Sequence, residues 1–153
     1  MSKPKFVYVI YIQSTVEKVW DAFTKPEFTR QYWCGTWHDT TWKAGASWKL
    51  MIPDGRVGDV GEVVEAEKPK RIVLRWRNEF RPELKKEGYS ICTIEMEQAG
   101  AAVKLKLTHE MDGPESKLIE AMSQGWPMIL SSMKTMLETG ESIEDTREWP
   151  KGF

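Results

Sequence analysis

Cysteine, long hydrophobic runs and net charge of either sign are all scarce in this sequence. The two cysteines, Cys34 and Cys92, are too few for the disulfide framework of a small secreted domain, so the chain suits a reducing compartment. No apolar run approaches the roughly 18 residues that a membrane-spanning helix needs. Lys3 and Lys5 precede a short apolar stretch, but no small-residue cleavage site of a secretion signal follows it. We therefore expect a cytoplasmic protein without membrane insertion.

The charge balance argues against a nucleic-acid partner. The formal net charge is −1, which gives no reason to expect a polyanion as partner. A basic stretch, residues 68–71, is followed by Arg75 and Arg77 on either side of Trp76. A strand with one solvated face explains this alternation more simply than a nucleic-acid site does. We expect no nucleic-acid partner.

Histidine is scarce as well, and no metal or cofactor motif is recognisable. His38 follows Cys34 by four positions and precedes Asp39, but the chain has only one other histidine, His109, and no paired ligand motif. There is no phosphate-cradling glycine loop, nucleophile elbow or dinucleotide fingerprint. Residues 58–61, with the sequence GDVG, are interpreted as a bulge in a strand. We expect no metal and no cofactor, and whether the protein is an enzyme stays open.

Short periodic segments separated by turn residues cover most of the chain. Close spacing of the last six strand-like segments leaves no room for crossover helices, so neighbouring strands should pair antiparallel. Ser14 and Glu17 form a capping-box pattern at the start of the first helix, and Pro26 opens the second. In chain order, the sequence predicts a strand over 5–13, helices over 15–24 and 26–32, strands over 36–42, 46–52, 57–67, 71–79, 89–97 and 102–111, and a final helix over 114–140.

The final helix has a wide apolar face. Pro114 suits its first turn, Gly140 suits its C-terminal cap, and Pro127 should kink it. The residues after it are charged and lack periodicity, so we expect one domain over 1–141 and a mobile tail over 142–153. Apolar positions of the helix recur at steps of three and four: Leu118, Met122, Trp126, Ile129, Met133, Met136 and Leu137.

Three sets of residues occur in a recognisable order along the chain: 19–27 (VWDAFTKPE), 107–109 (LTH), and Gly125, Trp126, Leu130, Met133, Leu137, Glu138, Thr139 and Gly140. They resemble homologues of the C-terminal domain of the activator of heat-shock protein 90 ATPase, within the START/SRPBCC helix-grip superfamily. The resemblance implies an α+β fold, with a curved seven-stranded antiparallel sheet around a long C-terminal helix and two short helices after the first strand. It also implies a cavity for a hydrophobic or amphipathic ligand, and it makes a chaperone a candidate partner.

The apolar faces of the helix and the sheet supply candidate ligand-binding residues. Alternation within the strands turns Trp76 and His109 toward the helix, and the abundant tryptophan and methionine suit a pocket lining. The alternative is that these side chains pack against one another as core. His109 would hydrogen-bond a ligand, act as an acid or base near neutral pH, or be a core histidine bonded to Trp126 or to backbone. The candidate residues are Trp33, Trp37, Trp48, Trp76, Cys92, Ile94, Leu107, His109, Met122, Trp126 and Met133.

These observations lead to one hypothesis and two alternatives. The hypothesis is a protein that binds a small hydrophobic or amphipathic ligand, without catalysis, in a cavity between the long helix and the sheet. One alternative is an enzyme of the cyclase or hydratase type that uses a polar pocket residue such as His109 or Tyr89. The other is a chaperone-interacting module that uses exposed aromatic residues, among them Trp149. The sequence specifies neither the ligand nor the oligomeric state.

Overall fold

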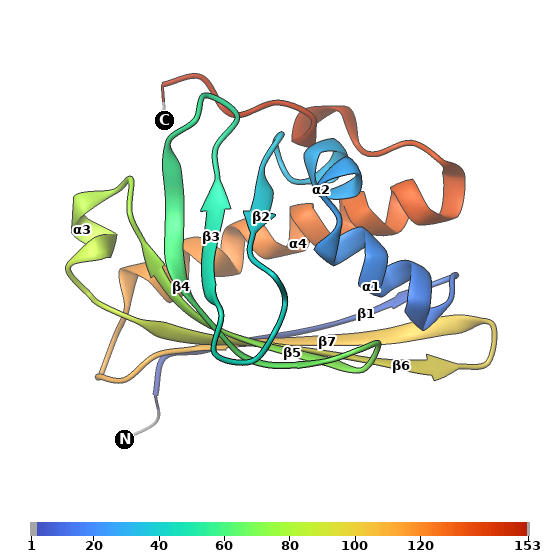
Figure 1. Cartoon of the computed structure of the whole chain (residues 1–153), viewed down its shortest axis with the longest axis horizontal. Coiled ribbons are helices and arrows are strands. Elements are labelled where there is room, and N and C mark those ends of the chain that lie inside the picture. The colour runs from blue at the N-terminus through green and yellow to red at the C-terminus, as the bar shows by residue number, and fades with distance from the viewer. Residues whose placement is uncertain (1–2, 153) are drawn as a thin grey trace.

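Seven strands form one antiparallel sheet that curves around a long C-terminal helix (Figure 1). The computed structural model describes residues 3–152. Helices α1 and α2 lie beside α4, on the side of the sheet that faces it (Figure 1). The elements are β1 (Lys5–Ile12), α1 (Val16–Thr24), α2 (Pro26–Tyr32), β2 (Trp37–Asp39), β3 (Ser47–Met51), β4 (Val57–Glu67), β5 (Arg71–Asn78), α3 (Pro82–Lys85), β6 (Ser90–Ala99), β7 (Ala102–Glu110), α4 (Lys117–Thr139) and the 3-10 helix η1 (Glu144–Thr146).

The strand order across the sheet is β1-β7-β6-β5-β4-β3-β2. Strands β2 to β7 therefore form a meander, and β1 returns to pair with β7, placing Lys5 opposite Glu110 and Ile12 opposite Val103. The predicted α+β helix-grip fold is confirmed, including the two short helices after the first strand. Apart from the segments corrected below, the predicted elements agree with the structure to within two residues at either end.

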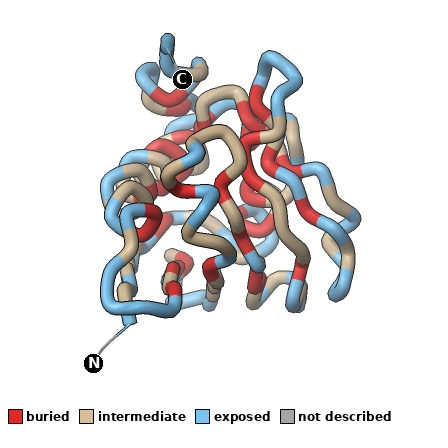
Figure 2. The backbone as a smooth tube through the Cα atoms, turned by 90° about the vertical axis from the view of Figure 1, so that its left-hand side faces the viewer, coloured by how far each residue is buried: buried red, intermediate tan, exposed pale blue. Residues whose placement is uncertain are grey.

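Residue alternation decides which face of each strand is buried. In β7, Val103, Leu105, Leu107 and His109 are buried against the helices, and the residues between them are more exposed. Figure 2 shows the same alternation of buried and exposed segments along the strands. The inward faces predicted from parity are confirmed, and the core lies between the sheet and α4.

A bulge at Gly58 interrupts this alternation in β4. Leu50 of β3 pairs with Asp59, whereas the next residue, Met51, pairs with Val57, so Gly58 is the extra residue. A Cβ atom at Gly58 would come within 3.2 Å of the Leu50 carbonyl oxygen. The predicted bulge is confirmed. Because a bulge re-aims the side chains beside it, Gly58 and Asp59 are both buried, although they are neighbours in the strand.

The N-terminus of α4 lies three residues beyond the predicted one. The helix begins at Lys117 rather than Pro114, with Ser116 as its N-cap. The Glu87 carboxylate, from the loop before β6, accepts hydrogen bonds from the backbone N–H groups of Lys117 (2.9 Å) and Leu118 (3.3 Å). These N–H groups have no partner within the helix, so a carboxylate that binds them sets where the helix begins.

Two other helix ends can be compared with the sequence predictions. Gly140, with φ of 94°, ends α4 as predicted, and the helix continues through Pro127. The N-cap of α1 is Thr15, whose Oγ1 accepts from Lys18 N at 3.3 Å. The prediction that Ser14 fills this position is therefore wrong by one residue.

Two segments before β6 also differ from the predictions. The strand predicted over 36–42 spans only Trp37–Asp39, and Trp42 has φ of 58°, which an extended strand does not allow. The Trp42 indole instead donates to the Thr24 carbonyl at the end of α1, at 3.3 Å. The loop predicted over 80–88 contains the short helix α3, which buries Leu84.

Candidate ligand-binding site

Most of the predicted pocket residues pack together in the centre of the core. The Trp76 and Trp126 rings lie edge to face at 5.7 Å, Trp48 lies 4.6 Å from Trp76, and Trp33 lies 5.1 Å from Trp126. These rings fill the space between the middle of α4 and the sheet. Trp33, Trp48, Trp76, Cys92, Ile94, Leu107, His109, Trp126 and Met133 are buried, and Trp37 and Met122 are half-buried.

His109 is a core histidine with both ring nitrogens bonded. The Trp126 indole N–H donates to His109 Nδ1 at 3.1 Å, and His109 Nε2 lies 2.8 Å from Ser90 Oγ. Because Nδ1 accepts, Nε2 holds the proton and donates it to the Ser90 hydroxyl, which in turn donates to the Trp76 carbonyl at 2.9 Å. Burial lowers the pKa of His109 to about 3, so the ring is neutral. The core alternative for His109 accounts for all of these contacts.

His38 occupies a second buried aromatic position. The Trp48 indole N–H donates to His38 Nδ1 at 2.9 Å, and His38 Nε2 is the one fully buried side-chain N or O atom without a partner among residues 3–152. The rings of Phe23, Trp33 and Trp42 lie 5.0 to 5.1 Å from the imidazole. An N–H group facing such rings gains a weak interaction with their π electrons. Burial lowers the pKa of His38 to about 3.

A cavity of about 320 Å³ lies at one end of this core, beside the N-terminal half of α4. Trp33 and Trp76 separate it from the packed centre, and Trp33, Trp76 and Met122 are the predicted pocket residues that line it. The rest of its α4 wall is small or apolar: Leu118, Ala121, Gly125 and Ile129. A Cβ atom added at Gly125 would have no heavy atom within 4 Å. The helix face therefore leaves free volume at Gly125.

A larger surface groove, of about 620 Å³, lies elsewhere and has charged walls. Arg71 in this groove pairs with Glu95 at 2.9 Å and with Glu65 at 3.1 Å. Lys70 there lies 3.9 Å from Glu67. Mutually paired, half-exposed charges of this kind form a solvated face, so the smaller apolar cavity is the better candidate for a ligand.

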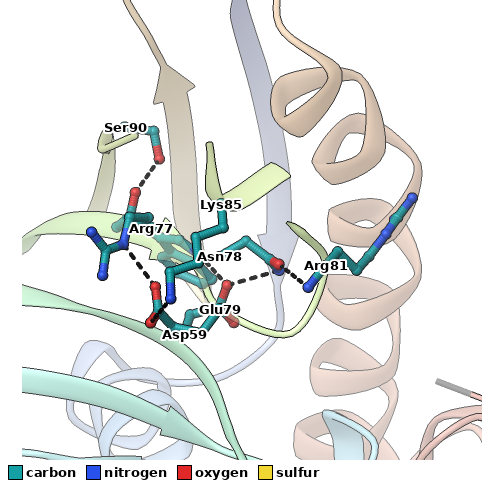
Figure 3. A network of polar contacts seen from close by, with 8 residues as sticks. Asp59, Arg77, Asn78, Glu79, Arg81, Lys85 and Ser90 are labelled. Carbon is teal, nitrogen blue, oxygen red and sulfur yellow. Dashed lines mark hydrogen bonds and ion pairs between the residues drawn. The ribbon is translucent and has the colours of Figure 1, made fainter. Parts of the chain in front are cut away.

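Asp59 places a buried carboxyl group on the wall of the 320 Å³ cavity, and Figure 3 shows this group beside Asn78. Asp59 is 5% exposed to solvent. Its Oδ1 accepts hydrogen bonds from Trp76 Nε1 at 2.9 Å and from Asn78 Nδ2 at 3.2 Å. Burial raises the pKa of Asp59 to about 7, the Glu79 charge adds to the increase, and the two hydrogen bonds oppose it. Near neutral pH the group therefore exists in both its neutral and its ionised form.

Sequence analysis did not identify Asp59 as a site residue. It lies in the GDVG segment, where the bulge at Gly58 gives the only signal in the sequence. Strict alternation does not specify which face Asp59 occupies, because the extra residue changes the parity of the strand.

A polar network fixes the loop between β5 and α3 at the edge of the cavity (Figure 3). Asn78 Oδ1 accepts from Arg81 N at 2.9 Å, which links the Asp59 partner to the start of α3. Glu79 pairs with Arg77 at 2.7 Å and with Lys85 at 3.3 Å. The loop is thereby held over the cavity, where Phe80, Arg81 and Leu84 contribute to the lining.

The C-terminal segment forms another wall of the cavity. For residues 142–153 we expect a mobile tail, of which residue 153 lies outside the described part of the chain. Thr146 Oγ1 lies 2.6 Å from Ser132 Oγ of α4, and the Thr146 carbonyl accepts from Cys34 N at 2.6 Å. Trp149 packs edge to face on Phe80 at 5.3 Å and lines the cavity. Part of this segment thus packs against the domain.

Residues 3–152 hold neither a cluster of metal ligands nor a helix of membrane-spanning character. This part of the chain contains no group of three or more His, Cys, Asp or Glu side chains placed to hold a metal ion. None of its helices is both long and apolar enough to cross a membrane.

Comparisons with known proteins identify the sequence family and the fold. The family model described as Activator of Hsp90 ATPase homolog 1-like protein matches residues 13–138. A search of curated proteins found no match. Among solved structures, protein MLL2253 from Mesorhizobium loti is 19% identical over 88% of this chain and 96% of that chain, with a TM-score of 0.74.

Two further solved structures have similar scores. PFC0360w, an HSP90 activator from Plasmodium falciparum, is 26% identical over 88% of this chain and 96% of that chain, with a TM-score of 0.69. The Aha1 dimer from Colwellia psychrerythraea is 16% identical over 90% of this chain and 98% of that chain, with a TM-score of 0.70. These scores show a shared fold.

Proposed function

Because the chain belongs to the family of Activator of Hsp90 ATPase homolog 1-like proteins, we propose that it uses the helix-grip fold to bind a small hydrophobic or amphipathic ligand without catalysis. The site is the cavity beside α4, where Trp33, Trp76 and Met122 contact the ligand. The other predicted pocket residues, except the half-buried Trp37, belong to the packed core behind these three. Two isolated cysteines support a cytoplasmic location, because neither forms a disulfide.

The observation that carries this proposal is the cavity itself. Its volume of about 320 Å³ is at the lower end of the usual range for small-molecule sites, roughly 300 to 1,000 Å³. Apolar side chains from α4 and aromatic rings from the sheet and the C-terminal segment form most of its wall, with Asp59 as a buried polar group. An apolar cavity with few polar groups favours a small organic ligand over a highly charged one.

Fluorescence titration with 4-phenyl-1-butanol tests the proposal. Trp33, Trp76 and Trp149 line the cavity, so a bound probe should change tryptophan emission with a saturable, one-to-one dependence. Titration of N-acetyltryptophanamide corrects for direct quenching by the probe. A saturable heat change in calorimetry should give the same dissociation constant. An unsaturable response equal to that of the free fluorophore would contradict the proposal.

The second candidate is a chaperone-interacting module, favoured by the similarity to the HSP90 activator from P. falciparum. Stimulation of an HSP90 ATPase by this chain, with no response to the small-molecule probe, would favour that role. For an enzyme, Asp59 replaces His109 and Tyr89 as the polar residue in the cavity. His109 is bonded on both nitrogens, and Tyr89 lies beneath the guanidinium groups of Arg75 and Arg77, at 4.4 and 5.0 Å.

A further inference from the structure

Asp59 leaves one carboxylate oxygen open to the cavity. Both hydrogen bonds from the protein go to Oδ1. Oδ2 accepts none from residues 3–152, and it is not among the fully buried atoms that lack a partner, so solvent reaches it. Because Asp59 lines the cavity, Oδ2 is where a bound molecule can reach the carboxyl group. Because the protein supplies no donor to Oδ2, a ligand that displaces solvent there could supply one.

The cationic side chains near the cavity already have other carboxylates as partners. Arg81 pairs with Glu83 at 2.9 Å, and Lys85 pairs with Glu79. Asp59 is in no ion pair within the described chain, and the α4 side of the cavity carries no ionisable group. Cys34 also lines the cavity, and burial raises the pKa of its thiol, which keeps it neutral. Asp59 therefore has no counter-ion from the protein.

The walls of the cavity suit a cation that is attached to an apolar body. The aromatic side chains that line it are Trp33, Trp76, Phe80 and Trp149. Aromatic faces attract ammonium groups most strongly where water is displaced, and they also bury apolar carbon. An anion would meet the Asp59 carboxylate and gain nothing from these faces. A neutral molecule would leave the carboxylate without a counter-ion.

We infer that the ligand is an apolar amine whose ammonium group donates to Asp59 Oδ2 while its hydrocarbon part lies against Trp33, Trp76 and Met122. This inference rests on the proposed function and names its ligand class. Asp59 would fix the orientation of the ligand, and the aromatic walls would supply most of the buried area. An ammonium beside the carboxyl group favours its ionised form, so binding near neutral pH should release a proton.

Three probes with a common phenylbutyl group test this inference: 4-phenylbutylamine, 4-phenyl-1-butanol and 4-phenylbutyrate. Calorimetric titration of the whole chain near pH 7 should give at least about tenfold tighter binding of the amine than of the alcohol, as expected for a charge-assisted hydrogen bond in a buried site. The butyrate should bind most weakly. Titrations in buffers with different ionisation enthalpies should show proton release for the amine and none for the alcohol.

Asp59→Asn should remove the preference for the amine, so that the amine and the alcohol bind with similar affinity. Asn retains an oxygen for the Trp76 indole but has no charge. The matched control is Asp39→Asn, which removes the charge of an exposed carboxylate in β2 and should keep the preference. On the wild-type chain alone, amine affinity should rise from about pH 6 to pH 8 while alcohol affinity stays constant.

The outcomes separate this inference from the proposed function. Equal binding of amine and alcohol to the wild-type chain, or an unchanged preference in Asp59→Asn, overturns the amine inference and leaves ligand binding intact. If none of the three probes binds the wild-type chain, the proposed function fails and the inference fails with it. If Asp59→Asn folds poorly, the pH series on the wild-type chain still tests the amine inference.

Discussion

At the scale of single residues, burial and hydrogen bonding distinguish His109, which is structural, from Asp59, the candidate ligand-binding residue. Strand parity in the sequence turns His109 inward and offers Trp126 as its bonding partner in the core. The structure has this bond. Asp59 is also buried but keeps an open oxygen. Residue type alone does not distinguish these cases, because the positions of Trp76 and Asn78 around the carboxyl group depend on β5 pairing with β4.

The raised pKa of Asp59 should appear in the pH dependence of stability. The folded-state pKa of about 7 exceeds the ordinary value of 3.8. The protonated carboxyl therefore contributes stability that is fully present below about pH 4 and is lost as the pH rises through 7. Relative to Asp59→Asn, the wild-type free energy of unfolding should fall by about 1.4 kcal/mol per pH unit across this window.

Urea unfolding at about pH 5, 6 and 7 measures this difference. His38 and His109 have lowered pKa values, so their contribution is lost as the pH falls through the unfolded-state value of 6.5 toward 3, which is the opposite direction. Both histidines are present in the wild type and in the variant, so their effect cancels in the difference. A difference that does not change with pH would mean that Asp59 titrates normally in the folded protein.

At the scale of elements, the sequence predicted most helices and strands because their periodicity is local. The N-terminus of α4, which was misplaced by three residues, depends on a residue distant in the chain. Glu87 binds the first N–H groups of α4, and no pattern near residue 117 indicates this contact. The positive φ of Trp42 is a local feature that excludes this residue from β2, whereas the bond from its indole to Thr24 joins separate segments.

Glu87→Ala should destabilise the chain by about 1 to 2 kcal/mol, the cost of losing a helix cap. The variant loses the bonds to the N–H groups of Lys117 and Leu118 and the bond that Ser116 Oγ donates to the carboxylate at 2.6 Å. Urea unfolding measures the change. Glu115→Ala, at an exposed position beside the cap, is the matched control and should change stability by less than about 0.5 kcal/mol. Equal losses in both variants would show that Glu87 contributes no more than a surface charge.

At the scale of the whole molecule, the sequence predicted the sheet and the helix across it, but it did not specify where between them the cavity lies. Six closely spaced strands allow little besides a meander, so the topology follows from connection lengths. The centre between α4 and the sheet is filled by tryptophan rings, and the cavity lies at one end. Its position depends on α3 and on the C-terminal segment, whose packing has no periodic signal in the sequence.

Ligand uptake at this end of the molecule is tested most directly by filling the cavity from α4. Gly125 lines the cavity with open space beside it, whereas its neighbour Gln124 is exposed. Replacing a helical glycine by leucine should not destabilise the helix, since leucine has the higher helix propensity by up to about 1 kcal/mol. Gly125→Leu therefore removes space without removing stability.

The decisive measurement is the titration of Gly125→Leu, Gln124→Leu and the wild-type chain with 4-phenyl-1-butanol, with the urea midpoint of each recorded. We predict that Gly125→Leu loses saturable binding with an undiminished midpoint, while Gln124→Leu binds like the wild type. Wild-type affinity in Gly125→Leu would contradict the account, because the probe would then bind outside the cavity beside α4.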